Sequence, residues 1–138
     1  QGVGRLLTRM ARCCNPVPGD DVVGFVSRGR GLMVHRRGCP RTLELDPDRR
    51  ISVSWDAKAK IDRPVTLRIT TAHRPGILTA ISQVFSDRNI NITQVHAKPT
   101  SDEEAETSFT FNITGADKLQ DLTRSLEKLP GVTSVDRV

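Results

Sequence analysis

The chain has 138 residues, of which 36% are hydrophobic and 27% are charged, and its formal net charge is +5. This composition is typical of a folded globular protein and excludes disordered and collagen-like chains. The length corresponds to one medium domain or two small ones. No stretch approaches the run of about 18 apolar residues that a membrane helix requires, so we expect no membrane span.

The chain begins with Gln1 and carries no stretch typical of a secretory signal, so we expect it to be a piece of a longer protein. Its cysteines are Cys13, Cys14 and Cys39. An odd number of cysteines without a signal argues against a secreted disulfide framework. We therefore predict a reducing, cytoplasmic location.

The charge is unevenly distributed. Residues 1–63 hold 13 basic and 7 acidic side chains (net +6), whereas residues 64–138 hold 8 and 9 (net −1). Polar residues 57–63 run into Pro64, and we predict a linker there between domains at 1–56 and 64–138. Clustered arginines attract phosphate groups, although a solvated Arg-rich surface is the alternative. The arginines concerned are Arg28, Arg30, Arg36, Arg37, Arg41, Arg49 and Arg50.

The first domain shows short elements of mixed type. Leu6, Leu7 and Met10 have helical spacing and predict a short helix, which the Pro-rich residues 13–19 end. Residues 22–26 and 32–35 predict a hairpin around two glycines that permit positive φ. A brief helix at 40–45 and a strand at 51–55 complete a small α+β module.

The second domain alternates regularly between two periodicities. Residues 65–69 and 109–113 alternate as strands, and another strand begins at 90–92. Helical spacing marks 77–85 and 119–129, and a last strand covers 132–138. The order is βαββαβ. Right-handed crossovers convert it into a four-stranded antiparallel sheet with both helices on one face, the ferredoxin-like arrangement.

The second predicted strand of this domain is irregular. Ile90 and Ile92 share one parity, whereas Val95 and Ala97 share the other. A β-bulge at residues 93–94 would send all four into the core and turn Asn91 and His96 to the opposite face. The alternative is that strand pairing ends near residue 93.

The loop before the first long helix is a candidate anion site. Pro75 stands at the helix entry and Gly76 allows close approach. Backbone N–H groups of Gly76, Ile77 and Leu78 lie at the positive end of the helix dipole and suit a carboxylate. An ordinary proline-initiated helix remains the alternative.

The run His73-Arg74-Pro75-Gly76-Ile77-Leu78, followed by Ile90-Asn91-Ile92, resembles the ACT domain family. The resemblance implies an amino-acid sensor that pairs side by side with its ligand between two copies. It places Asn91 where members hold the ligand and His96 at the same interface. The implied ligand-binding residues are His73, Arg74, Gly76, Ile77, Leu78, Asn91 and His96. A branched-chain amino acid, valine or isoleucine, is the expected ligand, and a ligand-free dimerisation module is the alternative.

Cys13, Cys14, His35 and Cys39 have the composition of a structural Cys₃His zinc site. Adjacent cysteines are unusual ligands because neighbouring side chains diverge in regular structure. The following Pro-rich turn could bring both sulfurs round. Buried cysteines used as small apolar residues, with a hairpin histidine, are the alternative.

Residues 11–21, 24–31 and 34–40, taken together, resemble the C-terminal regulatory region of long RelA/SpoT stringent-response enzymes. There, a cysteine-containing domain that inserts between the ribosomal subunits precedes an ACT domain. The resemblance implies that Cys13, Cys14, His35 and Cys39 occupy zinc-finger-like positions, with Gly38 as one departure from the pattern. It implies contact with ribosomal RNA through Arg28, Arg30, Arg36, Arg37 and Arg41.

The resemblance further implies a parent that makes and hydrolyses (p)ppGpp in domains upstream, so we expect this chain itself not to be an enzyme. Two rivals remain open. One is an ACT-type regulator that binds DNA. The other is a thiol enzyme using Cys13 or Cys39 with His35, which no Cys-x-x-Cys motif or evident orienting carboxylate supports.

Overall fold

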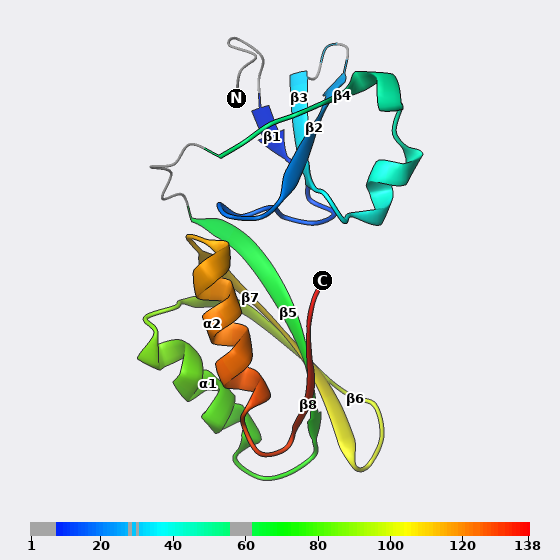
Figure 1. Ribbon diagram of the computed structural model, residues 1–138. Coiled ribbons are helices and arrows are strands. Elements are labelled where there is room, and N and C mark those ends of the chain that lie inside the picture. The colour runs from blue at the N-terminus through cyan, green and yellow to red at the C-terminus, as the bar shows by residue number, and fades with distance from the viewer. Residues whose placement is uncertain (1–7, 28, 30, 56–61) are drawn as a thin grey trace.

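The computed structural model describes residues 8–27, 29, 31–55 and 62–138. These residues form two units, each built on its own four-stranded sheet, and the units lie end to end (Figure 1). Among the described residues, no helix is both long and apolar enough to cross a membrane.

The first unit contains a small sheet with strand order β1-β3-β2-β4. Strands β2 and β3 pair antiparallel from Val22–Arg36 to Ser27–Gly31, which confirms the predicted hairpin. Gly29 and Gly31 both have positive φ, as the tight reversal requires. The element bounds are β1 Thr8–Met10, β2 Val22–Ser27, β3 Gly31–Arg36, η1 Pro40–Glu44, η2 Pro47–Arg49 and β4 Arg50–Ile51.

Three predictions for this unit need correction. Residues 8–10 form a strand parallel to β3 rather than a helix, because sheet pairing satisfies their backbone groups, while Leu6 and Leu7 lie outside the described residues. The strand expected at 51–55 is reduced to Arg50–Ile51, and Val53 and Trp55 pack against the core without pairing. The helix at 40–45 is a short 3₁₀ helix over 40–44.

The second unit has the predicted βαββαβ order and strand order β6-β7-β5-β8, all antiparallel. Both helices lie on one face of its sheet (Figure 1). The predicted α+β fold with a ferredoxin-like second half is therefore confirmed. Its elements are β5 Arg63–Ala72, α1 Ile77–Asp87, β6 Ile92–Pro99, β7 Glu104–Ile113, α2 Ala116–Glu127 and β8 Val132–Arg137.

The predicted bulge in β6 is also confirmed. Ile92 pairs with Phe111 and Gln94 pairs with Thr110, so one extra residue stands between them. This shift restores Val95 to the face of Phe109, a fully buried ring. The bulge therefore puts Ile92 and Val95 on one face of the strand. The expectation that Val95 and Ala97 enter the core is wrong for the single chain, because both lie exposed on the edge strand β6.

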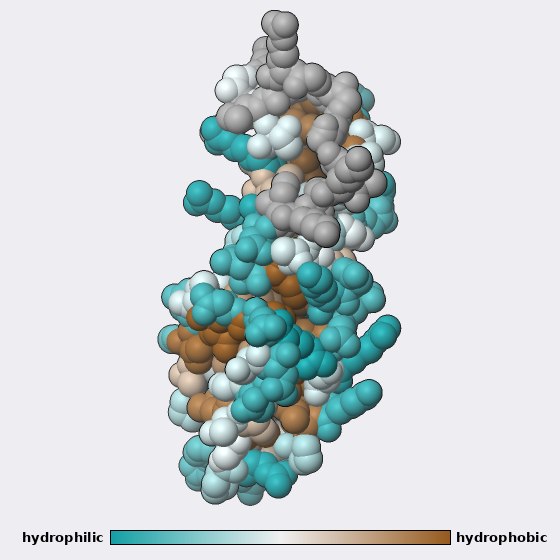
Figure 2. Space-filling model, turned by 90° about the vertical axis from the view of Figure 1, so that its left-hand side faces the viewer, coloured by the Kyte–Doolittle hydropathy of each residue, from teal (hydrophilic) through white to brown (hydrophobic). Residues whose placement is uncertain are grey.

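The surface of the molecule is mostly hydrophilic on the face shown in Figure 2, and apolar area gathers on the second unit there. Exposed large apolar side chains include Leu43, Leu78 and Val95. The second unit's interior is built from its two helices, from alternate positions of β5 and β7, and from one residue of the first unit, Val17. Its core residues are Val17, Val65, Leu67, Ile69, Ile81, Phe85, Phe109, Phe111, Ile113, Leu119, Leu122 and Leu126.

Candidate functional site

The three cysteines and His35 come from three separate segments of the first unit. Cys13 and Cys14 lie in a helical turn closed by the Asn15 N–H, which donates to the Ala11 carbonyl (2.9 Å). Asn15 then adopts a left-handed conformation (φ 43°), which asparagine tolerates better than most residues. This turn lets two adjacent sulfurs face the same point.

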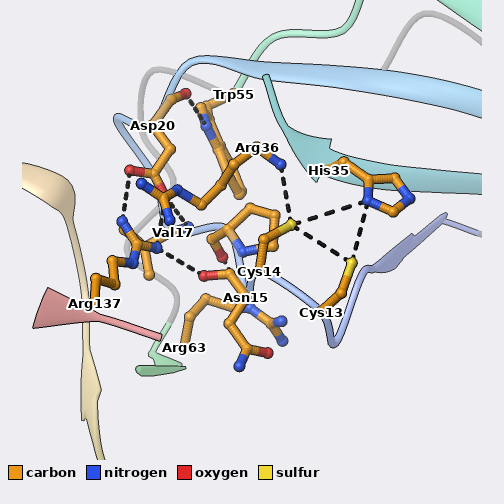
Figure 3. Close-up of polar contacts among 11 residues, drawn as sticks. Cys13, Cys14, Asn15, Val17, Asp20, His35, Arg36, Trp55, Arg63 and Arg137 are labelled. Carbon is orange, nitrogen blue, oxygen red and sulfur yellow. Dashed lines mark hydrogen bonds and ion pairs between the residues drawn. The ribbon is translucent and has the colours of Figure 1, made fainter. Parts of the chain in front are cut away.

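His35 near the end of β3 and Cys39 just before η1 complete the cluster. Cys13 Sγ lies 3.4 Å from His35 Nδ1, and Cys14 Sγ lies 3.9 Å from the same nitrogen (Figure 3). Cys13 Sγ also lies 3.5 Å from Cys39 Sγ. The two adjacent sulfurs are 4.0 Å apart, and all four ligand atoms lie within 4.8 Å of one another.

These separations fit a tetrahedral metal. With Zn–S near 2.3 Å and Zn–N near 2.0 Å, ligand atoms at tetrahedral corners are separated by about 3.5–3.8 Å. The separations in the cluster bracket that range. The donor set, three soft thiols and one imidazole, is also one that zinc prefers. The residues present therefore fit a structural zinc ion.

Burial and local hydrogen bonds together set the pKa values of the cluster. Burial raises the pKa of Cys14 to about 12 and also raises the pKa of Cys13. Burial likewise opposes ionisation of Cys39, but hydrogen bonds from the Arg41 backbone and the other two thiols, with the nearby Arg36 charge, lower its pKa overall. Burial lowers the pKa of His35, which favours the neutral imidazole that metals bind.

A second candidate site lies under the start of α1. A cavity of about 360 Å³ has the loop residues His73, Arg74, Gly76, Ile77 and Leu78 on one side. On the other side it is lined by the sheet positions Thr71, Ala97, Lys98, Pro99, Ala105 and Thr107. The cavity exists because the small residues Thr71, Thr107 and Ala105 follow the large Ile69 and Phe109 toward this end of the core-facing surface.

The loop is held in place by its neighbours. The His73 N–H donates to the Glu103 carbonyl (2.8 Å), and Gly76 begins α1 with φ 81°. The Ile77 N–H, expected to be free, makes a long bond to the Arg74 carbonyl (3.4 Å). Within the described residues, no backbone partner is seen for the N–H groups of Gly76 and Leu78.

Asn91 and His96 do not line this cavity. His96 pairs with Ser108, on the face of the sheet away from the helices, and Asn91 is exposed just before β6. Asn91 stands six residues from Ala97, or about 20 Å along a strand. One chain alone therefore does not bring Asn91 to the α1 loop.

The candidate phosphate-binding arginines are placed only in part. Arg28 and Arg30 lie outside the described residues. Arg37 forms an exposed ion pair with Asp21 (2.9 Å), and Arg41 lies beside Cys13 and His35 in a shallow cavity of about 270 Å³. Arg36 is partly exposed at the end of β3.

Comparison with known families agrees with both halves. Residues 1–56 match the family model of the RelA/SpoT RIS domain, and residues 61–137 match that of the ACT domain. This chain belongs to the ACT domain family. The crystal structure of the ACT domain from GTP pyrophosphokinase of Chlorobium tepidum covers 56% of this chain and 100% of its own, with a TM-score of 0.51 and 26% identity.

Relatives align along essentially the whole chain. GTP pyrophosphokinase of Myxococcus xanthus is 48% identical over 99% of this chain, and that of Escherichia coli K12 is 30% identical over 100%. The alignments cover 18% and 19% of those relatives, so the chain spans about a fifth of their length. The predicted resemblance to the RelA/SpoT regulatory region, a RIS domain followed by an ACT domain, is confirmed.

Sequence reasoning missed the residues that join the RIS and ACT domains. Arg137 of β8 pairs with Asp20, and the buried Val17 belongs to the ACT core. The only sequence signal was an apolar residue between two prolines in an otherwise polar turn. The sheet residues that form the α1 cavity were also missed, although the change from Phe109 to Thr107 and Ala105 at core-facing positions could have indicated it.

Proposed function

We propose that this chain is the regulatory part of a cytoplasmic stringent-response enzyme that makes and hydrolyses (p)ppGpp, divided at residues 1–56, 57–63 and 64–138. The observation that carries the proposal is the RIS and ACT pair in one chain, in the order found along relatives named GTP pyrophosphokinase. The two matching models are not those of catalytic domains, and we assign the chemistry to parts of the parent outside this chain.

In this proposal the ACT domain senses a branched-chain amino acid. The α1 loop offers backbone donors for a carboxylate, and the cavity beneath it is lined by aliphatic side chains that include Ile77, Ala97 and Ala105. A volume of about 360 Å³ is ample for a valine or isoleucine side chain.

The ligand's ammonium group needs an acceptor that the same chain does not bring close. In a side-by-side homodimer, Asn91 of a second copy would approach the α1 loop, since β6 is an edge strand with an open side. His96 would line the same interface between the two copies, on the sheet face away from the helices. The Asn91 carboxamide oxygen can accept from the ammonium. The dimer therefore completes the site.

Ligand binding acts on the parent by linkage. An amino acid that binds one arrangement of the dimer more tightly than another shifts the parent toward the tighter-binding arrangement. The shift cannot exceed the difference between its affinities for the two arrangements. The family's logic makes amino-acid sufficiency favour hydrolysis of the alarmone.

Calorimetry with valine, isoleucine and leucine tests the sensor. We expect saturable binding by the wild type and none by Asn91→Ala, whereas Asn112→Ala, an exposed asparagine on β7, keeps the wild-type affinity. Equal affinity in the Asn91 variant would refute the assigned pocket. Dimerisation without binding of any of the three would favour a structural module.

For the RIS domain we propose a structural zinc ion held by Cys13, Cys14, His35 and Cys39. The bound ion would cross-link the turn after β1 to the end of β3 and the start of η1. The separations of the four ligand atoms support it. Metal analysis of protein purified without chelator should give close to one zinc per chain. Absence of zinc, together with an enzymatic activity that requires the thiols, would favour the alternative of a thiol enzyme that uses Cys13 or Cys39 with His35.

We further propose that the RIS domain contacts ribosomal RNA through its arginines, mostly at phosphates. Changing Arg28, Arg30, Arg36 and Arg37 to Glu should weaken ribosome co-sedimentation and leave amino-acid affinity unchanged. A salt series comparing ribosomes with duplex DNA separates this role from a DNA-binding regulator. Tighter binding to duplex DNA at every salt concentration would refute the ribosomal role.

A further inference from the structure

Residues 15–20, here called the docking segment, follow the cysteine pair directly, and Asn15 and Asp20 of this segment contact Arg137 of the ACT domain (Figure 3). Val17 of this segment is completely buried and belongs to the same hydrophobic cluster as the ACT core. Val17, three residues after Cys14, is therefore an interior residue of the ACT domain although it belongs to the RIS domain in sequence.

The backbone of the docking segment also caps an ACT helix. The Pro18 carbonyl accepts from the Ala116 N–H at the start of α2 (2.8 Å). Gly115, the N-cap residue, provides no side-chain acceptor there, so Pro18 satisfies a donor that helices otherwise leave free. The docking segment and the start of α2 approach so closely that a Cβ on Gly19 would lie 3.2 Å from the Ala116 Cβ.

An ion pair fixes the far end of the segment. Arg137 of β8 donates to both carboxylate oxygens of Asp20, and the two side chains are only 14% and 10% exposed. The Asp20 carboxylate also accepts from the Val17 N–H (2.7 Å). The backbone carbonyl of Asp20 accepts from Trp55 Nε1 (3.0 Å). Asp20 thus shapes the turn and holds it to both domains.

Arg137 also reaches the residue next to the metal ligands. Its Nη2 donates to the Asn15 carbonyl (2.9 Å), while Arg63 donates to the Pro16 carbonyl (3.3 Å). On the other side of the cysteine pair, the Arg36 N–H donates to Cys14 Sγ (3.2 Å). The Cys14 sulfur is therefore fixed by a hydrogen bond from its own domain. The backbone of the next residue, Asn15, is fixed by a hydrogen bond from the ACT domain.

We propose that Arg137, acting through Asp20 and Asn15, is a positioning residue for the metal site, so that metal binding and docking of the ACT domain strengthen each other. The inference rests on the proposed zinc site. The sulfurs of two adjacent cysteines face one point only while the backbone after them keeps its turn conformation. Arg137 stabilises that turn through the Asn15 carbonyl and the Asp20 carboxylate. Coupling of this kind is reciprocal, because each event stabilises the conformation that the other requires.

Competition for zinc against a chromophoric chelator, with the full 138-residue chain, tests the proposal. Groups that orient metal ligands typically change metal affinity by about 10- to 100-fold when mutated. We expect a loss of that size in Arg137→Gln. The matched control is Arg88→Gln, which removes an arginine ion-paired with Asp121 inside the ACT domain (2.9 Å) and should bind zinc as the wild type does.

Two further readouts separate positioning from a general loss of stability. The Co²⁺-substituted Arg137 variant should show weakened or shifted thiolate-to-metal absorption at full folding, judged by circular dichroism. In the wild type, zinc should slow hydrogen exchange of the Ala116 amide, which bonds to Pro18, and this effect should disappear in the variant.

If Arg137→Gln does not fold, Arg137→Lys decides the question, since it keeps the charge but not the bidentate geometry. It should show an intermediate zinc affinity. Zinc affinity and cobalt spectra equal to the wild type in the folded variants would overturn the positioning role while leaving the zinc site intact. A wild type that binds no zinc would overturn both.

Discussion

Arg137 and Asp20 lie 117 positions apart in the chain, yet their side chains form a two-pronged ion pair, with Nη1 to Oδ1 at 3.1 Å and Nη2 to Oδ2 at 2.9 Å. The pair joins the last strand of the ACT domain to the turn that follows the cysteine pair of the RIS domain. It is shielded from water, so each charge depends on the other for stabilisation.

Removing one member of this pair should destabilise the protein strongly. We expect Arg137→Ala to lower the free energy of unfolding by about 3 kcal/mol or more, because it leaves the Asp20 carboxylate buried without a counter-charge. Urea unfolding of the two single variants and the double variant Asp20→Ala/Arg137→Ala measures the coupling between the two residues. Additive losses would contradict it.

The exposed pair of Arg37 and Asp21 provides the control. Its distance is the same 2.9 Å, but its side chains are 47% and 75% exposed. We expect Arg37→Ala to cost about 1 kcal/mol or less, as surface pairs do. A loss as large as that of Arg137→Ala would mean that burial is not what gives the Arg137 pair its strength.

Gly19 should be irreplaceable where the two domains meet. Its φ is +100°, and a Cβ there would crowd Ala116 at 3.2 Å. We expect Gly19→Ala to destabilise the chain by about 1–3 kcal/mol, combining the cost of positive φ with displacement of α2. Gly38→Ala, where a Cβ meets nothing within 4 Å, should change thermal unfolding little. Equal effects of the two substitutions would contradict this account.

The parts of the fold that sequence periodicity predicted are those with one buried and one open face. Alternation along β5 and β7 follows from a sheet covered by helices on one side, and the parity change in β6 located the bulge. The short strand Thr8–Met10 was missed because three residues carry no periodicity and owe their conformation to pairing with β3.

The sites were predictable to the extent that residue type alone indicates chemistry. Three thiols and an imidazole predicted a cluster of possible metal ligands, and the structure brings their four ligand atoms within 4.8 Å of one another. Val17, Asp20 and Arg137 were not predictable, because a valine between prolines does not reveal which core it enters. No local pattern relates Asp20 to a strand at the end of the chain. Contacts between the domains depend on how both halves have folded.

Removal of the proposed zinc ion should make the RIS domain unfold at a lower temperature. At free zinc about 1,000-fold above Kd, a single bound ion contributes about 4 kcal/mol. For a unit of this size, a strong chelator should therefore lower Tm by at least about 10 °C. Cys14→Ser should lack this shift, because it removes a buried ligand. A chelator-dependent shift of equal size in Cys14→Ser would contradict the assigned ligand set.

Filling the cavity beneath α1 should block the proposed amino-acid binding without disturbing the proposed dimer. Ala105 lies beside Thr71 on the core-facing side of the sheet and lines the cavity. A leucine there occupies the volume that a ligand side chain needs, so we expect Ala105→Leu to reduce valine affinity at least about tenfold, which corresponds to about 1.4 kcal/mol.

The matched control is Ala72→Leu. Ala72 follows Thr71 in β5, and its side chain faces away from the helices. This variant should leave valine affinity unchanged, as calorimetry can measure for both variants. Sedimentation should show the same oligomer for each, since the β6 edge is untouched. Undiminished valine binding by Ala105→Leu would place the ligand elsewhere, because a preformed apolar cavity admits a side chain only while its volume is free.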